Sequence, residues 1–335
     1  METVLKNEVV EKFSGVDLKL HHLVPSLKRR NWRELGITVS GDAPKNFLAI
    51  YEYEIRSGIK RCNVDTWPKY IAKVGHKWYP IESINEYLFN QLGEVLGLNM
   101  AASKLVMIKG QLRFLSRYFL KPDKESLIHG AEIFAGYISD LEFIESVEEM
   151  GLARKFFTFQ FAKDAINHMF PDDAQHILEN FVKMLVFDAV TGNNDRHFYN
   201  WGVVKDIKSK KCPKFAPVYD SARGLFWNDS EAKLEKWYDD PNQIKNRIQK
   251  YSEGSRPKIG WEEVDDLNHF ELIERIYKEE PTYKEICASL ISKENLDKMI
   301  KFLDVNFNSY LTSKRIELIK MCLVYRYDRL NAIVQ

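Results

Sequence analysis

The stretch DRHFYNWGVV, residues 195–204, is followed by a Lys-rich loop and then by KFAPVYDSARGLFW, residues 214–227. Its two short apolar runs, WGVV and FAPVY, are separated by a turn, a pattern typical of a β-hairpin. Asp195, Asn200 and Asp220 flank these runs, so a hairpin would bring their side chains to one rim. Carboxylate and amide oxygens are hard ligands, suited to Mg²⁺ that is held together with substrate phosphates. The stretch therefore predicts a Mg²⁺–phosphate site.

An Asp, an Asn five residues later and a further Asp are also the working parts of kinase active sites. Asp195 is the candidate that accepts or orients the proton of a substrate hydroxyl. Asn200 and Asp220 are the candidate Mg²⁺ ligands. The alternative is that residues 193–195 only end a helix and form a turn. The spacing to Asn200 and Asp220 favours the site over this alternative.

Two neighbours of Asp195 have different expected roles. His197 is expected to pack and hydrogen-bond so that it braces the loop. For Arg196 the sequence leaves open whether the side chain is exposed or meets a phosphate. The nearby aromatic residues are expected to pack in the core rather than stack on a nucleotide; they are Trp201, Phe226 and Trp227.

The composition is that of an ordinary globular protein. The chain has 335 residues, of which 45% are hydrophobic and 29% are charged, and its net charge is +1. This length allows one large domain or two lobes. The near-zero net charge gives no general attraction to nucleic acid or to an anionic membrane. Direct nucleic-acid binding is therefore not expected.

The cysteines and the N-terminus indicate the compartment. Four cysteines are scattered without the spacing of a metal site, which favours reduced thiols over a disulfide framework; they are Cys62, Cys212, Cys287 and Cys322. No run approaches ~18 uninterrupted apolar residues, so no membrane span is expected. Residues 1–13 contain early Glu and no apolar core, unlike a signal peptide. We expect a cytoplasmic protein, with secretion or translocation into a host cell left open.

Residues 1–118 are predicted to form a β-rich lobe with one helix. The expected strands are rich in aromatic and β-branched residues; they cover residues 47–55, 69–75, 104–108 and 112–117. Residues 79–98 change to a helical period with one apolar face. Ser83 and Glu86 fit a capping box at the start of this helix, and Gly97 fits its C-terminal cap.

Residues 119–335 are predicted to form a mostly helical second lobe, which begins near the polar connector 121–126. The expected helices cover residues 153–166, 174–190, 242–251, 269–277, 283–290, 295–303 and 313–331. Residues 174–190 are apolar on more than one face, as is typical of a central buried helix. Gly192 would end this helix just before Asp195. The fold class is therefore α+β, with two lobes.

The first lobe offers candidates for gripping phosphates, which phosphoryl transfer requires. Residues 36–41 have Gly at both ends, so backbone N–H groups there could approach phosphate oxygens; a plain turn is the alternative. Lys73 lies in an alternating strand and could bind α- and β-phosphates; a solvated edge lysine is the alternative. Glu86 could hold Lys73, but it could not do so while also capping its helix.

The order of these motifs resembles that of the HipA-type protein kinase family. Four segments carry the resemblance: VSGDAPK at 39–45, IAKVG with INEYLFNQLGEVLGLN at 71–75 and 84–99, GNNDRHFYNWGVV at 192–204, and FAPVYDSARGLF at 215–226. The last two are specific and the first two are supportive. The family reverses the His-Arg-Asp order of ordinary kinases, as residues 195–197 do here.

The resemblance implies a two-lobed, protein-kinase-like fold and an ATP- and Mg²⁺-dependent Ser/Thr protein kinase. Carried over by motif, Asp195 is the catalytic residue, and Asn200 and Asp220 are metal ligands. Lys73, together with Glu86, meets the phosphates, and Val39, Ser40 and Gly41 belong to the phosphate-binding loop. Ser116 and Tyr118 lie at the hinge that meets adenine. Ala43 stands where the family usually has Gln.

The resemblance also implies a form of regulation. In the family, Ser residues of the phosphate-binding loop become autophosphorylated, and the loop then leaves its nucleotide-binding conformation. Thr38 and Ser40 occupy that place here. A phosphate adds about −2 charge and would repel the phosphates of the nucleotide. We therefore expect inhibitory autophosphorylation at Thr38 or Ser40.

The chain resembles the short form of the family. This form includes toxins of toxin–antitoxin systems, whose missing N-terminal piece is a separate protein, and kinases translocated by pathogens. The expected partners are a protein substrate with a Ser or Thr acceptor and a separate antitoxin or small N-subdomain-like protein. The family suggests a translation factor as the substrate. Two alternatives remain open: a small-molecule kinase, and a catalytically inactive binding module.

Overall fold

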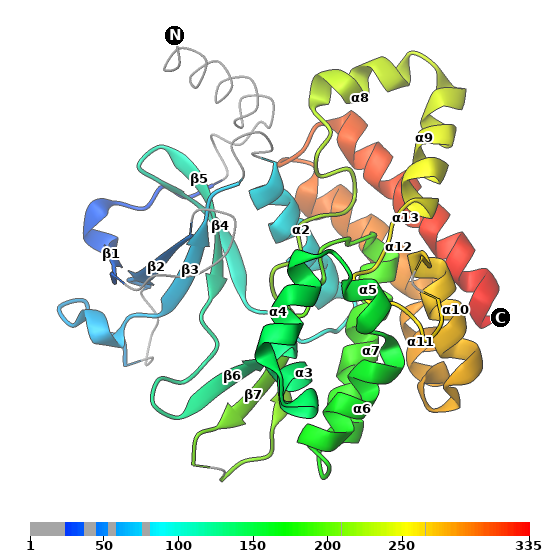
Figure 1. Ribbon diagram of the computed structural model, residues 1–335. Helices are drawn as coiled ribbons and strands as arrows, with labels where there is room; N and C mark the ends of the chain where they lie inside the picture. Colours follow the sequence, from blue (N-terminus) through cyan, green and yellow to red (C-terminus); the bar gives the residue numbers. More distant parts are fainter. Residues whose placement is uncertain (1–23, 37–44, 53–57, 76–80, 209, 265) are drawn as a thin grey trace.

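The computed structural model describes residues 24–36, 45–52, 58–75, 81–208, 210–264 and 266–335. Within these residues, a five-stranded sheet and one α-helix form the first lobe, and a three-stranded sheet with the remaining α-helices forms the second (Figure 1). The α+β, two-lobed architecture expected from the sequence is confirmed.

The sheet of the first lobe is antiparallel and has the strand order β1-β2-β3-β5-β4. Its strands are β1 Trp32–Glu34, β2 Lys45–Ile50, β3 Lys69–Lys73, β4 Ser103–Ile108 and β5 Gln111–Arg117. Strand β3 is interior, between β2 and β5, and its register pairs Lys45 with Lys73. Lys45, the first residue of β2, and Lys73, the last residue of β3, therefore lie side by side at the same end of the two strands.

Helix α2, Glu82–Val95, packs between this sheet and the second lobe (Figure 1). The predicted capping box is wrong, because the helix begins one residue before Ser83 and Ile81 occupies the N-cap. Ser83 and Glu86 are therefore both buried within the helix. Gly97 follows the last turn with φ +76°, the left-handed conformation expected of a glycine there.

The predicted hairpin is present, as β7 Gly202–Asp206 and β8 Lys214–Phe215. Its second strand pairs with β7 at Lys214 and Phe215, and residues 218–220 continue outside this ladder. A third strand, β6 Glu125–His129, pairs with β7. It overlaps the predicted polar connector 121–126. Strand β6 is half-buried throughout, so its sequence lacks a clear apolar pattern.

The helices of the second lobe are α3 Gly130–Ile138, α4 Leu141–Glu149, α5 Ala153–Phe156, α6 Phe159–Met169, α7 Ala174–Thr191, α8 Glu231–Tyr238, α9 Pro241–Glu253, α10 His269–Glu279, α11 Lys284–Leu290, α12 Lys293–Phe302 and α13 Ser313–Val334. The single helix predicted over 153–166 is wrong. The chain leaves the helical region at Phe157, and the Thr158 hydroxyl caps α6 by accepting from the Phe161 N–H.

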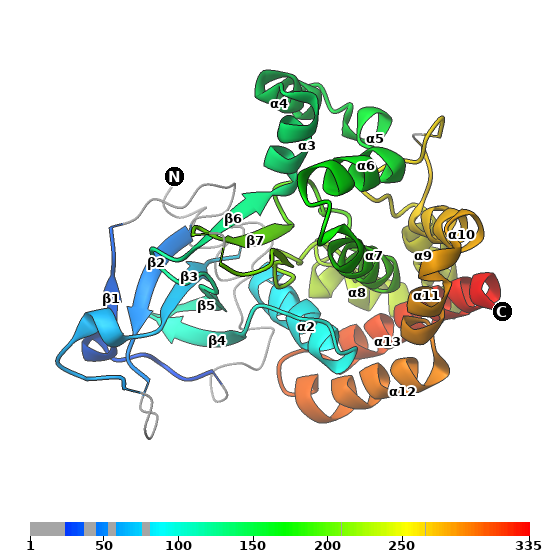
Figure 2. The same ribbon diagram turned by 90° about the horizontal axis from the view of Figure 1, so that it is seen from below.

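Helix α7 is the central buried helix that the sequence predicted. It contacts α6, α10, α11 and α13, which surround it (Figure 2). Thirteen of its 18 residues are buried. Gly192 ends it with φ +69°, and an added Cβ there would lie 3.0 Å from the Arg326 guanidinium. The conformation and this contact favour glycine, and the chain turns at Gly192 into Asp195.

Candidate active site

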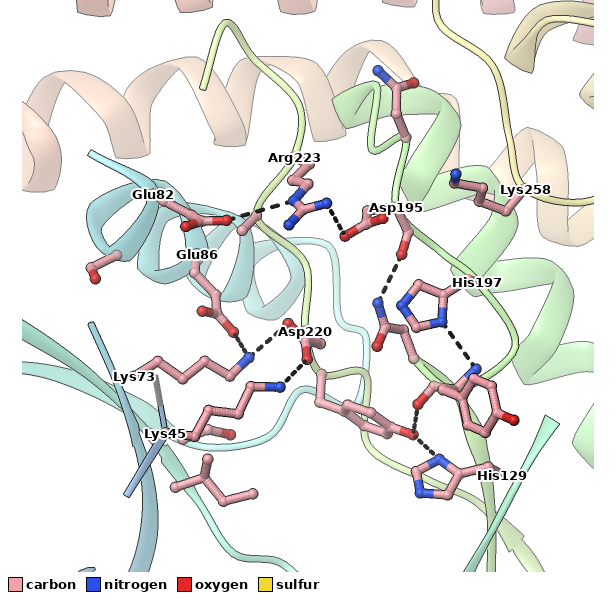
Figure 3. Close-up of a pocket in the computed structure, with 18 of the residues that line it drawn as sticks. Lys45, Lys73, Glu82, Glu86, His129, Asp195, His197, Asp220, Arg223 and Lys258 are labelled. Atoms are coloured by element: carbon pink, nitrogen blue, oxygen red, sulfur yellow. Dashed lines mark hydrogen bonds and ion pairs between the residues drawn. The ribbon is translucent and has the colours of Figure 1, made fainter. Parts of the chain in front are cut away.

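A cleft with a volume of about 1140 Å³ lies between the lobes, large enough for a nucleotide-sized ligand. One wall comes from β3, β5 and α2. The other comes from the loop after α7 and the segment after β8 (Figure 3). The described candidates all line this cleft: Lys73, Glu86, Ser116, Tyr118, Asp195, Asn200 and Asp220. The predictions at Thr38, Val39, Ser40 and Gly41 lie outside the described residues.

Lys73 joins the two walls of the cleft. Its Nζ lies 2.6 Å from Glu86 Oε1 and 2.7 Å from Asp220 Oδ1 (Figure 3). Its side chain is only 9% exposed, so the solvated-edge interpretation of this lysine is wrong. Burial would lower the pKa of Lys73, but the carboxylates of Asp220 and Glu86 raise it. Lys73 is therefore a charged ammonium whose two present partners are both acidic.

Asp220 is held between two lysines. In addition to Lys73, Lys45 Nζ lies 3.5 Å from its Oδ2. Burial would raise the pKa of Asp220, but Lys73 and Lys45 hold it well below the usual range. The backbone of Asp220 has φ +54°, an uncommon conformation for a residue other than glycine. No role was predicted for Lys45, although it is the last residue of the quoted motif at 39–45 and the first residue of β2.

The loop that follows α7 presents Asp195 and Asn200 together. The Asn200 side-chain amide donates to the backbone oxygen of Asp195 at 2.8 Å. This bond orients Asn200 so that its side-chain oxygen is the atom left to act as a ligand. The Asp195 side chain is 23% exposed at the cleft. The five-residue spacing thus brings the amide and the carboxylate to one loop, as the sequence predicted.

Arg196 braces this loop from inside the protein. Its Nε and Nη2 donate to Asp188 Oδ2 and Oδ1 at 2.9 and 3.0 Å. Its Nη1 donates to the backbone oxygens of Asn200 and Tyr219 at 2.8 and 2.7 Å. Arg196 is 5% exposed, so it does not meet a phosphate. These bonds connect α7, the Asp195 loop and the segment that leads to Asp220.

His197 makes a hydrogen bond within its own loop. Its Nδ1 accepts a hydrogen bond from the Tyr199 N–H at 3.3 Å and lies 3.9 Å from Glu148. Burial lowers the pKa of His197, although the Asp195 carboxylate opposes this effect. The expected packing of the aromatic residues is confirmed for Trp201 and Phe226, which are buried.

The predicted hinge residues lie at the end of β5. Ser116 is buried and pairs with Ile71 of β3. The backbone N–H of Tyr118 donates to the Lys69 oxygen at 2.9 Å, and its ring packs edge-on against Phe47. The amide of Tyr118 is therefore committed to the sheet. Of its two backbone polar groups, the carbonyl is the one left for a base in the cleft.

Arg223 is a site residue that the sequence analysis missed. Its Nη1 lies 3.2 Å from Asp195 Oδ2 and its Nε lies 3.6 Å from Glu82 Oε1 (Figure 3). It stands three residues after Asp220, inside a quoted motif. Neither its spacing nor its neighbours indicate a partner on α2, because Glu82 is more than a hundred residues away.

The donor set fits Mg²⁺ held with phosphates rather than an all-protein metal cage. Among the described residues, no group of three or more His, Cys, Asp or Glu side chains is arranged to hold a metal ion. Asp220 and Asn200 together supply one carboxylate and one amide oxygen at the cleft. Mg²⁺ commonly uses one or two such ligands and completes its shell with water and phosphate oxygens. The arrangement can therefore serve phosphoryl transfer.

Residues 37–293 match the HipA-like C-terminal domain family, and the chain belongs to this family. A search of curated proteins found no match. Among solved structures, the fold is similar to the Helicobacter pylori proinflammatory kinase CtkA, with a TM-score of 0.70 and 15% identity. The match covers 93% of this chain and 96% of that one. The protein-kinase-like fold expected from the sequence is thereby confirmed.

A second solved structure is the complex of HipA, HipB and operator DNA from a Shewanella oneidensis toxin–antitoxin system. It matches with a TM-score of 0.41 and 14% identity, over 98% of this chain and 70% of that one. The fold assignment rests on the family match and on CtkA. None of the helices in the described ranges has the length and apolar character that a membrane span needs.

Proposed function

We propose that the protein is an ATP- and Mg²⁺-dependent Ser/Thr protein kinase of HipA type. The observation that carries the proposal is the Lys73 ammonium, which lies 2.6 Å from Glu86 and 2.7 Å from Asp220 at the cleft that Asp195 and Asn200 also line. This set matches the parts that kinases use. We also propose that the first lobe ends at Tyr118 and that the second lobe covers residues 119–335.

In this proposal each side chain has one task. Lys73, oriented by Glu86, binds the α- and β-phosphates of ATP. Asp220 and the side-chain oxygen of Asn200 hold Mg²⁺, which neutralises charge on the phosphates when bound. Asp195 accepts a hydrogen bond from the Ser or Thr hydroxyl and orients it toward the γ-phosphorus. The Lys73–Asp220 ion pair, at 2.7 Å, brings the phosphate-binding group and the metal-binding group together.

The proposal is tested by incubating the protein with γ-labelled ATP, Mg²⁺ and a cell lysate. Wild type should label lysate proteins on Ser or Thr, and Asp195→Asn and Lys73→Met should lower labelling by about 10³-fold or more. A thermal shift with ATP and Mg²⁺ checks that Asp195→Asn still folds and binds nucleotide. Equal labelling by wild type and Asp195→Asn would exclude the mechanism.

The same experiment separates the two alternatives. Labelling of small alcohols but not of proteins would indicate a small-molecule kinase. Absence of both labelling and thermal stabilisation by ATP and Mg²⁺ would indicate an inactive binding module. The family match favours the protein kinase, because the reversed order of Asp195, Arg196 and His197 is the order that this family uses.

Regulation and partners extend the proposal. Inhibitory autophosphorylation at Thr38 or Ser40 would appear as phosphate on either residue after incubation with ATP, detected by mass spectrometry. A toxin role would appear as growth arrest on expression, relieved by a separate antitoxin and abolished by Asp195→Asn. Growth arrest by the Asp195→Asn variant as well would separate toxicity from phosphoryl transfer.

A further inference from the structure

We propose that Arg223 is a positioning residue that holds the Asp195 carboxylate and makes its orientation depend on helix α2. The inference rests on the proposed function, in which Asp195 orients the substrate hydroxyl. Arg223 lies between Glu82 of α2 and Asp195 of the opposite wall, and Figure 3 shows its guanidinium directed at both carboxylates.

The side chain of Arg223 is itself held in place. Its guanidinium lies 5.3 Å from the centre of the Trp227 ring, within the range of a cation–π contact. Its side chain is 34% exposed, and that of Glu82 is 11% exposed. The planar guanidinium can meet two carboxylates at once, which the point charge of a lysine does less well. Arg223 engages Oδ2 of Asp195, which leaves the other carboxylate oxygen for a substrate hydroxyl.

The backbone of Arg223 is tied to both walls. The Asn85 side chain in α2 donates to the carbonyl oxygens on either side of it, at 2.5 Å to Ala222 and 2.9 Å to Gly224. The N–H of Asn194, next to Asp195, donates to the Arg223 oxygen at 3.0 Å. A movement of α2 would therefore be passed to Asp195 through backbone bonds as well as through the guanidinium.

Helix α2 thus holds both proposed catalytic carboxylates by the same device. Glu86 holds Lys73, which holds Asp220; Glu82 holds Arg223, which holds Asp195. Glu82 and Glu86 are four residues apart and therefore lie on one face of the helix. Each carboxylate of α2 is joined through one cation to a carboxylate of the other wall. The position of helix α2 then determines where Asp220 lies on the metal side of the cleft and where Asp195 lies on the acceptor side.

The test compares Arg223→Gln, Arg223→Lys and Glu82→Gln with wild type, using ADP release with ATP, Mg²⁺ and casein as the acceptor. Arg223→Gln should lower kcat about 10²-fold, since a misplaced catalytic group costs that much. Its KM for ATP should change less than about threefold, because Lys73 is untouched. Arg223→Lys should recover part of kcat, and Glu82→Gln should lower it about tenfold.

Hydrogen–deuterium exchange of residues 193–200, without nucleotide, provides a readout that needs no turnover. Exchange there should be faster in Arg223→Gln than in wild type and intermediate in Arg223→Lys. Arg275→Gln is the matched control, because Arg275 pairs with Glu279 on the exposed face of α10; it should leave exchange and kcat unchanged.

Three results would overturn the inference: a kcat of Arg223→Gln at or above that of wild type, a rise in KM that accounts for the whole loss, or unchanged exchange at 193–200. Failure of the proposed function looks different. In that case wild type itself releases no ADP above the Asp195→Asn background, and the exchange experiment still decides whether Arg223 positions the Asp195 loop.

Discussion

Asp188 accepts two hydrogen bonds from the guanidinium of Arg196, at 2.9 and 3.0 Å, and both side chains are buried. A planar guanidinium facing a carboxylate through two bonds is the strongest common ion-pair geometry. The pair joins the last turns of α7 to the loop that carries Asp195. Within the triplet 195–197, the structural residue Arg196 thus directly follows the proposed catalytic residue Asp195.

Replacing Arg196 by Met should therefore destabilise the protein strongly. The variant leaves the Asp188 carboxylate buried without its cationic partner, which typically costs about 3–5 kcal/mol of unfolding free energy. Urea denaturation followed by circular dichroism measures the loss. Arg275→Met is the control, because its pair with Glu279 is exposed to solvent and should contribute little to stability. Losses of equal size in the two variants would contradict a structural role for the Arg196 pair.

Asp220 should make stability depend on acid pH. Lys73 and Lys45 hold its pKa below the ordinary value of 3.8. The stabilisation that the ionised Asp220 carboxylate provides is therefore present above pH 3.8. It is lost as the pH falls toward the lower pKa of Asp220 in the folded state. The unfolding free energy of wild type minus that of Asp220→Asn should shrink between about pH 4 and pH 2.

This acid window is separate from the titration of Glu86. Burial raises the pKa of Glu86 to about 7, although Lys73 opposes the shift. Glu86 therefore binds a proton more tightly in the folded protein than in the unfolded chain. Its contribution to the unfolding free energy decreases as the pH rises above 4.5, which is the opposite direction to that of Asp220. Asp266→Asn, which alters a side chain that is 77% exposed, is the control. A difference between wild type and Asp220→Asn that stays constant from pH 4 to pH 2 would contradict the prediction.

Gly224 is expected to tolerate no side chain. A Cβ there would lie 2.7 Å from the backbone oxygens of Thr191 and Gly192 and 2.8 Å from the Phe89 ring. Backbone oxygens cannot move aside cheaply, so Gly224→Ala should lower the unfolding free energy by about 1–3 kcal/mol. It should also lower phosphate transfer, since Gly224 adjoins Arg223.

Gly136→Ala is the matched control for this steric prediction. Its Cβ would meet the flexible side chain of Met169, at 2.7 Å from the sulfur, rather than backbone. Alanine also has a helix propensity about 1 kcal/mol better than that of glycine. Urea denaturation should show a stability of Gly136→Ala equal to or above that of wild type. A similar loss in both alanine variants would mean that the close approach at residue 224 is not the cause.

The four thiols should divide into two classes. Cys62 and Cys212 are exposed, and Cys287 and Cys322 are buried. Burial raises the pKa of Cys287 to about 12 and also raises that of Cys322, so neither forms the reactive thiolate near neutral pH. A thiol reagent such as Ellman's should label two cysteines in the native protein and four in urea. Rapid labelling of a third native thiol would contradict this burial pattern.

Periodicity and local spacing were enough to identify the two-lobed fold, the buried helix α7 and the hairpin. These features are local, because apolar repeats and turn residues act within a few positions of the chain. The five-residue step from Asp195 to Asn200 was readable for the same reason. Strands β1 and β6 and helices α3, α4 and α8 were missed. Strand β6 is half-buried throughout, and its ladder depends on a partner about 77 residues further along, so no short apolar pattern predicts it.

Contacts between distant residues needed the folded chain. The sequence left Glu86 with two exclusive roles, and the position of α2 beside β3 selects the ion pair with Lys73 over the helix cap. For Arg196 the sequence allowed either an exposed side chain or a contact with a phosphate. The side chain is instead buried in an ion pair with Asp188. The meeting of Arg223 with Asp195 has no counterpart in local sequence. Charge pairs form where packing brings side chains within a few ångströms, and only the three-dimensional arrangement of the lobes sets those distances.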